Sequence, residues 1–431
     1  MHNDTPLASV ALRPQWASYV PAMALIAVVV AAISPRATPF MLLLLGGSIA
    51  ALGFASAALS WRPLPGLVVA LLVLDAYLGL NALWSLSPAF ALGRVVIVAL
   101  IAAMGLAVAR ALPALTPADA TRLQSAILCA IVATSVYLAI EVVFDQPLRR
   151  LVVSIIPPLR PAPKHMTTVD GWVTGINLYT LNRNLAVLNI MLWPALLLLR
   201  TRFSPSKAWL SGGALIALGA IAAFPSEHET SMIALVVGCI VLAGMAISAS
   251  VTRALVIALW IAATMLVVPA ANIAHDAGLH RVAWLPQTAR NRIVLWNVTA
   301  DRMLDSPILG IGIGSTKPLD EEAAHDAPLE EGDAYAQRTG RHAHNIFMQA
   351  WFELGAAGAI LLLVVGLIAL RAMIRLPAKV QPFTFASFAS TMVVASFSWG
   401  MWQPWFMCAF GFWAVLLLIG LDAARRAAPS T

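Results

Sequence analysis

The stretch RTGRHAHNIFMQAWFELGAAGAILLL, residues 338–363, passes from a basic loop with two histidines, His342 and His344, into a long apolar run. A helix needs about 20 predominantly apolar residues to cross the hydrocarbon core of a bilayer. The run supplies them, so the stretch predicts a membrane-spanning helix whose first turn emerges from a polar loop.

The rest of the chain extends this pattern. Of its 431 residues, 60% are hydrophobic and 11% are charged, whereas soluble domains have roughly 45–50% and 25%. The sequence therefore predicts an all-α polytopic membrane protein, with residues 1–431 forming one integral membrane domain of about twelve transmembrane helices. The predicted spans are 16–34, 39–60, 66–84, 91–112, 123–143, 183–200, 208–224, 230–249, 254–271, 345–370, 383–400 and 404–422.

Lysine and arginine gather in alternate short loops of this layout, from Arg110 and Arg122 to Arg425 and Arg426. The remaining short loops carry little beyond Arg36. Positive loops stay in the cytoplasm, so both termini are predicted to be cytoplasmic, in the inner membrane of a bacterium. Topology explains much of the net charge of +7, and nucleic acid is not expected as a partner.

Two connections are long, residues 144–182 and residues 272–344, and both fall on the predicted periplasmic side. Long loops in a compact protein are usually functional or disordered, so the activity is predicted to lie outside the cytoplasm. Within the second loop, 290–307 has the apolar spacing of a short amphipathic helix. The following GIGIGS, 310–315, lacks the strand–turn–helix context of a dinucleotide site, which favours a turn that needs glycine.

Asn345, Gln349 and Glu353 follow at intervals of four along the opening stretch. Residues four apart share one helix face, so the three predict a polar stripe that faces other helices or a wet cleft. The spacing alone does not decide between contacts that hold helices together and the lining of an active site.

Histidine and arginine are the residues at this edge that can carry chemistry. A neutral imidazole of His342 or His344 can act as a base near neutral pH. The acidic clusters at 319–322 and 330–333 offer oxygen ligands, but a solvated acidic loop is favoured and no metal site is predicted. The guanidinium groups of Arg183, Arg290 and Arg292 suit either lipid headgroups or a substrate diphosphate.

Three features resemble one family. His344 and Asn345, followed at fixed spacing by Gly355 and Gly358, fit the motif of bacterial O-antigen ligases of the O-antigen ligase/polymerase superfamily. RIVLWNVTADRMLDSPILGIGIGS, 292–315, is similar to the segment that precedes this motif, and NALWSLSP, 81–88, also has the look of the family. The resemblance covers most of the chain through the span layout and the large loop before the tenth span.

The resemblance implies a fold similar to the C-type glycosyltransferases. It implies an inverting, metal-independent enzyme without a cofactor, which moves a glycan from undecaprenyl diphosphate to lipid A–core on the periplasmic face. By position, His344 matches the essential histidine, Arg292 the arginine at the head of the loop helix, and Arg183 an arginine at the outer end of the sixth span. The further residues expected at the substrate are Arg290, His342, Asn345, Gln349 and Glu353.

Alternatives of the same superfamily are an O-antigen polymerase and a protein O-oligosaccharyltransferase, and the alternative outside enzymes is a lipid-linked glycan transporter. Membrane lipid is expected around the protein in every case. The serine–arginine pair that the resemblance implies near the eighth span is replaced here by SEHETS, 226–231. The roles of His228 and Glu229 in that segment stay open.

Overall fold

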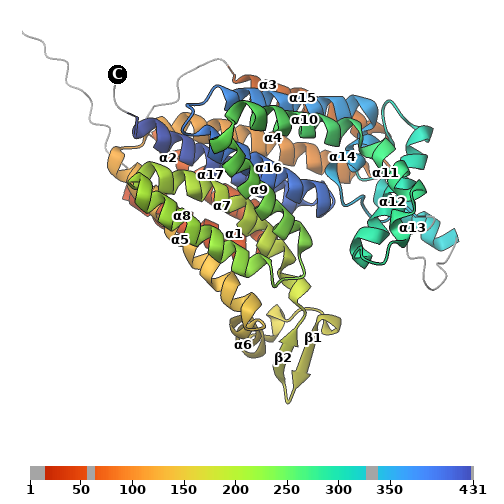
Figure 1. The fold of residues 1–431 in the computed structure, drawn as a ribbon, viewed down its shortest axis with the longest axis horizontal. Coiled ribbons are helices and arrows are strands. Elements are labelled where there is room, and N and C mark those ends of the chain that lie inside the picture. The colour runs from red at the N-terminus through yellow and green to blue at the C-terminus, as the bar shows by residue number, and fades with distance from the viewer. Residues whose placement is uncertain (1–14, 56–63, 327–337, 429–431) are drawn as a thin grey trace, which may run out of the picture.

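The computed structural model describes residues 15–55, 64–326 and 338–428, and these form a bundle of helices (Figure 1). The predicted acidic cluster at 330–333 lies outside the described residues. In chain order the α-helices are α1 (Val20–Ile33), α2 (Thr38–Ala55), α3 (Gly66–Asn81), α4 (Pro88–Ala111), α5 (Pro117–Val143), α6 (Pro147–Ile155), α7 (Asn182–Arg202), α8 (Pro205–Ala223), α9 (Glu229–Ile247), α10 (Ala249–Met265), α11 (Val267–Asp276), α12 (Gln287–Arg302), α13 (Thr316–Asp326), α14 (Ile346–Gln349), α15 (Gly355–Ile374), α16 (Gln381–Phe397) and α17 (Pro404–Arg426).

Within the described residues, ten helical segments are long and apolar enough to cross a membrane, or eleven if α10 and α11 form one broken span. The chain is thus an all-α polytopic membrane protein, as predicted. The predicted span 254–271 needs correction, because the chain bends by 72° between α10 and α11. Pro269 lies in the first turn of α11, where its missing N–H cannot continue the helix from α10.

Helix α7 forms the centre of the bundle. Its side chains are buried on every face, from Asn184 to Leu199, and it contacts α5, α8, α9, α16 and α17. A helix that is apolar all round belongs in the core of a protein or a bilayer. The central position of α7 fixes its first turn, which carries Arg183, relative to the helices around it.

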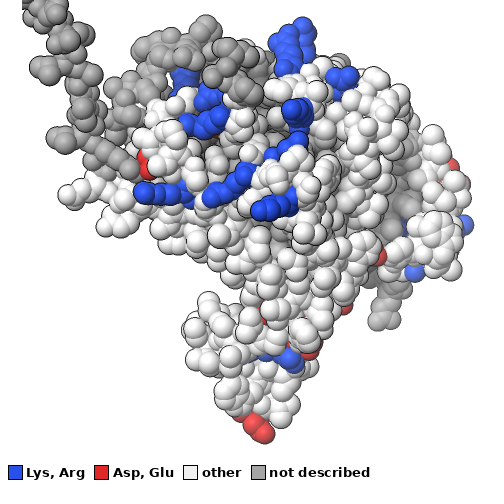
Figure 2. Space-filling model, turned by 60° about the vertical axis from the view of Figure 1, so that its left-hand side comes forward, with Lys and Arg blue, Asp and Glu red and all other residues white. Residues whose placement is uncertain are grey.

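The two ends of the bundle differ. Helices α11, α12 and α13 lie together at one end, called here the loop end, and the C-terminal end of α17 lies at the other (Figure 1). Figure 2 shows lysine and arginine side chains gathered around the C-terminal end. The helix ends that carry cations there include those of α7, α15 and α17. This is the distribution on which the predicted orientation depends.

The connection 144–182 folds into helix α6 and a two-stranded antiparallel hairpin, β1 (Met166–Val169) and β2 (Trp172–Ile176). Gln146 donates a hydrogen bond from Nε2 to the carbonyl of Ile176 at 2.6 Å, which fastens the end of the hairpin to the start of α6. In Figure 1 this unit lies beyond the end of α5, apart from α11–α13.

The predicted span 345–370 is interrupted. A π-helical turn, Ala350–Leu354, separates α14 from α15. The segment after α12 pairs with this break, since the N–H of Gly312 donates to the carbonyl of Glu353 at 2.9 Å. Gly310 and Gly355 both have φ near +70°, and they lie where the two segments cross. A Cβ on either glycine would lie 2.4 Å from the backbone of the other segment. GIGIGS therefore forms a turn that needs glycine, and this turn packs directly against the π-helical break between α14 and α15.

Candidate active site

His344 is held at the loop end in a defined orientation. Its backbone is left-handed, with φ +53°, a conformation uncommon outside glycine and often found at functional positions. Its Nδ1 donates a hydrogen bond to the carbonyl of Ser398 at 2.6 Å. Because a carbonyl can only accept, the hydrogen must reside on Nδ1, and the lone pair resides on Nε2.

The neighbours of His344 are fixed from both sides. Asn345 ends the loop as the N-cap of α14, with its Oδ1 accepting from the N–H of Phe347 and Met348. On the other side, the carbonyl of Ala343 accepts a hydrogen bond from Nε1 of Trp296 at 2.6 Å. Helix α12 thus anchors the histidine loop directly.

His342 and His344 lie with ring centroids 4.1 Å apart, so the loop brings the two imidazoles together. Burial lowers the pKa of His342 to about 3, and the positive charges nearby, including that of Arg292, add to the effect. Burial also lowers the pKa of His344 from 6.5, with a further contribution from Arg292, while the hydrogen bond to Ser398 opposes the shift. Both imidazoles are therefore neutral at neutral pH.

Arg292 is the cation around which the histidines gather. It lies in the second turn of α12 and is half-buried. Its charge acts on His342 and His344 and also on His228, the N-cap residue of α9. Three segments far apart in the sequence thus lie within range of the charge of Arg292.

His228 and Glu229, whose roles the sequence left open, lie beside α12. Burial lowers the pKa of His228 to about 3, with Arg292 contributing, and its Nδ1 is hydrogen-bonded to Oγ of Ser231 at 2.7 Å. Glu229 accepts a hydrogen bond from Oγ1 of Thr288 at 3.3 Å. The segment 226–231 therefore supports the first turns of α12.

The segment SWGMWQPW, 398–405, called here the 398–405 loop, consists of the connection between α16 and α17 and the first two residues of α17. It joins these parts, and the sequence interpretation did not single it out. The carbonyl of Ser398 holds His344 by a hydrogen bond, and the side chain of His342 packs against Gly400. The ring of Trp399 lies 5.3 Å from that of His228 and 4.8 Å from that of Trp405. Three tryptophans in seven residues at a span end are the sequence signal that could have pointed to it.

Glu353 is fully buried, and its carboxylate is surrounded by hydrogen-bond donors of the chain itself. It accepts from the N–H of Gly314 at 2.9 Å, from the N–H and hydroxyl of Thr316, and from Nε1 of Trp402. Gln349 donates to it at 3.4 Å and accepts from the N–H of Met401 at 3.0 Å. The polar stripe thus fastens the GIGIGS turn and the 398–405 loop to one helix end.

The upstream segment 81–88 docks on the same turn. Asn81 donates from Nδ2 to the carbonyls of Leu309 and Glu353, and its Oδ1 accepts from the N–H of Ile313 at 2.8 Å. Ser85 donates its hydroxyl to the carbonyl of Ile313 at 2.6 Å. The structure therefore connects the three segments on which the resemblance rests.

Arg183 contacts the 398–405 loop at Trp405. Its guanidinium lies over the ring of Trp405, 5.6 Å from the centroid, and its Nε is buried without a hydrogen-bond partner. Asn184 donates to the carbonyls of Ala32 and Ile33, just before the loop that carries exposed Arg36. Arg36 is thus a second cation at this end of α7 that the predicted site did not include.

Arg290 is not among the charges that act on the histidines. It turns back along α12, where its guanidinium donates to Oε1 of Gln287 at 2.5 Å, and its Nε is buried without a hydrogen-bond partner.

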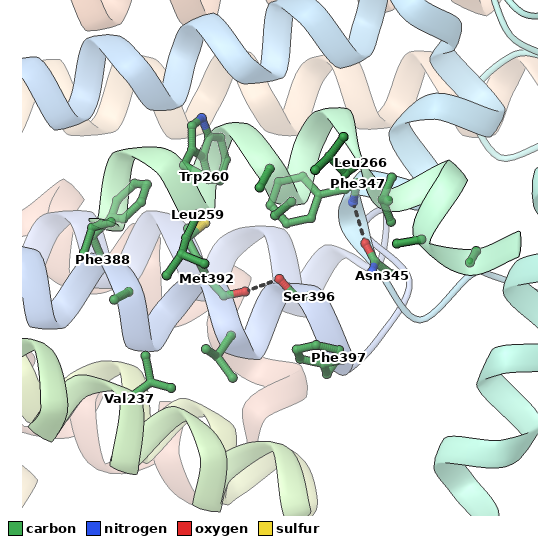
Figure 3. A pocket seen from close by; sticks show the side chains of 18 of the residues that line it. Val237, Leu259, Trp260, Leu266, Asn345, Phe347, Phe388, Met392, Ser396 and Phe397 are labelled. Carbon is green, nitrogen blue, oxygen red and sulfur yellow. Dashed lines mark hydrogen bonds between the residues drawn. The ribbon is translucent and has the colours of Figure 1, made fainter. Parts of the chain in front are cut away.

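An apolar groove of about 450 Å³ runs between α9, α10 and α16 and reaches the histidine loop (Figure 3). Its walls include Val237, Leu259 and Met392 along its length. Trp296, Asn345 and Phe397 line it as well. Asn345 follows His344 in the sequence and Phe397 precedes Ser398, and His344 and Ser398 are joined by a hydrogen bond. The groove is therefore lined by the residue that follows His344 in the sequence.

Acidic residues of the second loop pair with arginines. Asp320 accepts from Arg338 at 2.8 Å, and Glu321 accepts from Arg341 at 2.8 Å. Across the described ranges, no group of three or more His, Cys, Asp or Glu side chains is placed to hold a metal ion.

Comparison with known proteins gives a consistent result. Residues 212–363 match the family model described as O-antigen ligase. The chain is 24% identical over 249 residues to a protein of Rickettsia prowazekii provisionally named polysaccharide ligase, covering 57% of this chain and 59% of the relative. A similarly named protein of Rickettsia conorii is 26% identical over 132 residues, covering 30% and 31%.

The matches span less than two thirds of the length of these relatives. The match to the family model includes the loop that carries Arg292 and the helix end that carries His344, two of the three segments quoted for the resemblance. The resemblance to the O-antigen ligase superfamily is confirmed at this level, and the ligase specificity stays a prediction.

Proposed function

We propose that this membrane protein, similar to the O-antigen ligase superfamily, is an inverting glycosyltransferase that uses a lipid-diphosphate donor. The donor is a glycan on undecaprenyl diphosphate, and the acceptor is a sugar hydroxyl of lipid A–core. His344 is the general base and Arg292 binds the diphosphate. The observation that carries the proposal is the orientation of His344, neutral, with its Nε2 lone pair available, beside the guanidinium of Arg292.

The base must take a proton from the acceptor hydroxyl as its oxygen attacks the anomeric carbon. The hydrogen bond to Ser398 leaves Nε2 of His344 as the accepting atom. A pKa below 6.5 keeps this atom unprotonated at neutral pH. General base catalysis contributes typically about 10²–10⁴-fold to such a step.

The leaving group must be stabilised as the bond to the anomeric carbon breaks and negative charge grows on the diphosphate. The forked guanidinium of Arg292 matches phosphate oxygens bidentately, and it lies half-buried, where charge interactions are strong. Arg183, which lies over the ring of Trp405 in the 398–405 loop, offers a second guanidinium. These groups stabilise the leaving diphosphate in the proposed reaction without a metal or a cofactor.

The groove between α9, α10 and α16 suits the polyprenyl chain of the donor. Its lining is almost wholly aliphatic and aromatic, and a prenyl chain lying there stays within the hydrocarbon layer. Because the neighbour of His344 in the sequence, Asn345, lines the groove, a chain bound in it would bring its diphosphate toward the histidine and Arg292.

Orientation follows from charge. We assign the cation-rich C-terminal end to the cytoplasm and the loop end to the periplasm of a bacterial inner membrane. Asn345, Gln349 and Glu353 then act as positioning residues, because their hydrogen bonds fasten the loops that carry the site. His342 packs beside the base, and Arg290 is left without a role in the reaction.

A reconstituted reaction tests the proposal. Purified protein in detergent is given undecaprenyl-diphosphate-linked glycan and lipid A–core, and the glycosylated product is scored. We expect product with the wild type and with His165→Ala, a histidine of the hairpin unit, and none with His344→Ala. Normal transfer by His344→Ala would overturn the assignment of the base.

The acceptor is tested in the same reaction. Growth of the glycan on its lipid carrier in place of transfer to lipid A–core would indicate a polymerase. Transfer to a protein acceptor would indicate a protein glycosylase. Because detergent leaves no membrane to cross, product formation in any arm excludes a transporter as the sole activity.

A further inference from the structure

Helix α6 carries an apolar surface that no described part of the chain covers. Six large apolar side chains recur on one face of the helix and of the turn after it, at the spacing of successive helical turns. Each is between 43% and 64% exposed. This set, called here the α6 stripe, consists of Leu148, Leu151, Val152, Ile155, Ile156 and Leu159.

The charged side chains of the same helix turn inward, where the chain itself satisfies them. Arg149 donates to Oε1 of Gln146 at 2.8 Å and to Oγ1 of Thr180 at 2.6 Å. Arg150 donates to the carbonyl of Thr174 at 2.6 Å and pairs with Asp145 at 3.2 Å. A helix exposed to water on its outer face has the opposite arrangement, with charges outward and apolar residues inward.

The hairpin completes the inner side of the unit. Val153, the buried residue of α6, packs with Val173 and Ile176 of β2. Arg160, in the segment after the stripe, donates to the carbonyls of Val153 and Gly171. The hydrophobic core of the unit is therefore small, and the larger apolar surface faces away from it.

The α6 stripe continues the apolar surface of a membrane helix. Helix α5 ends at Val143, which is 49% exposed, and the next residue, Phe144, is 64% exposed. Only Asp145 and Gln146 separate this surface from α6. In Figure 1, α6 lies at the end of α5, outside the rest of the bundle, so lipid around α5 would also surround the stripe.

We propose that α6 lies in the interface of the bilayer, at the end of α5, with the α6 stripe in the acyl-chain layer and the hairpin on its aqueous side. The partner is the lipid bilayer itself. An amphipathic helix of this kind buries its apolar face at the boundary of headgroups and acyl chains. The alternative occupant, a second copy of the chain, has no comparable continuity with a surface already in lipid.

This contact reaches the start of α7. The bond from Arg149 to Thr180 ties α6 to the turn that precedes α7, three residues before Arg183. Helix α6 thus braces the end of α7 against the membrane surface. The inference about lipid contact does not depend on the proposed reaction.

Spin-label accessibility in nanodiscs tests the proposal on the full chain. In a background with Cys129, Cys239 and Cys408 replaced by alanine, single labels are placed by Leu151→Cys and Ile155→Cys. Leu100→Cys, exposed in the middle of α4, gives the lipid reference, and Glu322→Cys, exposed on α13, gives the water reference. Collision with oxygen, which concentrates in lipid, is compared with collision with a water-soluble nickel chelate.

We expect the labels at 151 and 155 to resemble the label at 100, with oxygen collision at least several-fold above that at 322 and little nickel collision. Nickel collision at the level of the label at 322 would overturn the proposal, since the stripe would then face water. Low collision with both reagents would also overturn it, because protein would then cover the stripe. Agreement between the two α6 positions guards against a local distortion at either one.

Discussion

Replacing Glu353 by glutamine isolates what its buried carboxylate does. The substitution keeps the shape of the side chain and exchanges one acceptor oxygen for an NH₂ group. On one side of the carboxylate the amide would face the N–H groups of Gly314 and Trp402, and on the other the N–H of Thr316. Every orientation therefore leaves at least one buried backbone N–H opposite a donor.

The cost follows from this count. A buried donor left without a partner costs about 1–3 kcal/mol, and the remaining hydrogen bonds weaken as their acceptor loses its charge. We expect the turn at 310–315 to be destabilised by about 3 kcal/mol. Since 1.4 kcal/mol corresponds to a factor of ten, amide hydrogens of the turn should exchange about a hundredfold faster.

Hydrogen–deuterium exchange with mass spectrometry on peptides covering 309–317 measures this directly, in the purified full chain. Glu322→Gln removes the same charge from an exposed position on α13 and should leave the exchange of this peptide unchanged. If Glu353→Gln abolished transfer while the exchange of 309–317 stayed at the wild-type rate, the positioning role would be refuted. A direct contact of Glu353 with substrate would then replace it.

Three further results are expected from glycan transfer with purified components. Arg292→Lys keeps the charge but loses the fork, so kcat/KM should fall by about 10–100-fold, and wild-type kinetics would refute bidentate binding. Because a protonated base is inactive, kcat/KM should fall as pH drops through the pKa of His344. The midpoint of this fall should lie below pH 6.5, and a midpoint above that value would contradict the buried environment assigned to His344. Ala263→Trp narrows the groove and should raise KM for the undecaprenyl donor, with little effect on a donor carrying a short prenyl chain; equal effects on both would count against the groove as the chain site.

The membrane layout could be predicted because it depends on local composition. Apolar runs of about 20 residues and cations in alternate loops can be counted along the chain, and most of the predicted spans correspond to helices. The bend between α10 and α11 was not predicted, because the apolar run of α10 continues into α11 past Pro269 without a change in composition. Composition records which segments prefer lipid but not where a helix turns.

The site was predictable only in part. His344 and Arg292 could be paired through the resemblance, and the structure brings them together. Glu353 was named as a candidate from its place in the polar stripe. Its hydrogen-bond partners Gly314 and Trp402 lie 39 and 49 residues away, so helix spacing could not reveal them. The same separation concealed Ser398, whose carbonyl orients His344 from 54 residues along the chain. Spacing on one helix shows which residues share a face, and not what that face meets.

The hydrogen bond between His344 and Ser398 also sets the order of events in the proposed reaction. A backbone carbonyl cannot take up a proton, so His344 cannot pass one to the protein interior through Nδ1. The proton that Nε2 gains from the acceptor must leave from Nε2 as well, on the side where the new glycosidic bond has formed. Recovery of the base therefore waits for the product to move aside, which links each turnover to the clearing of the cleft.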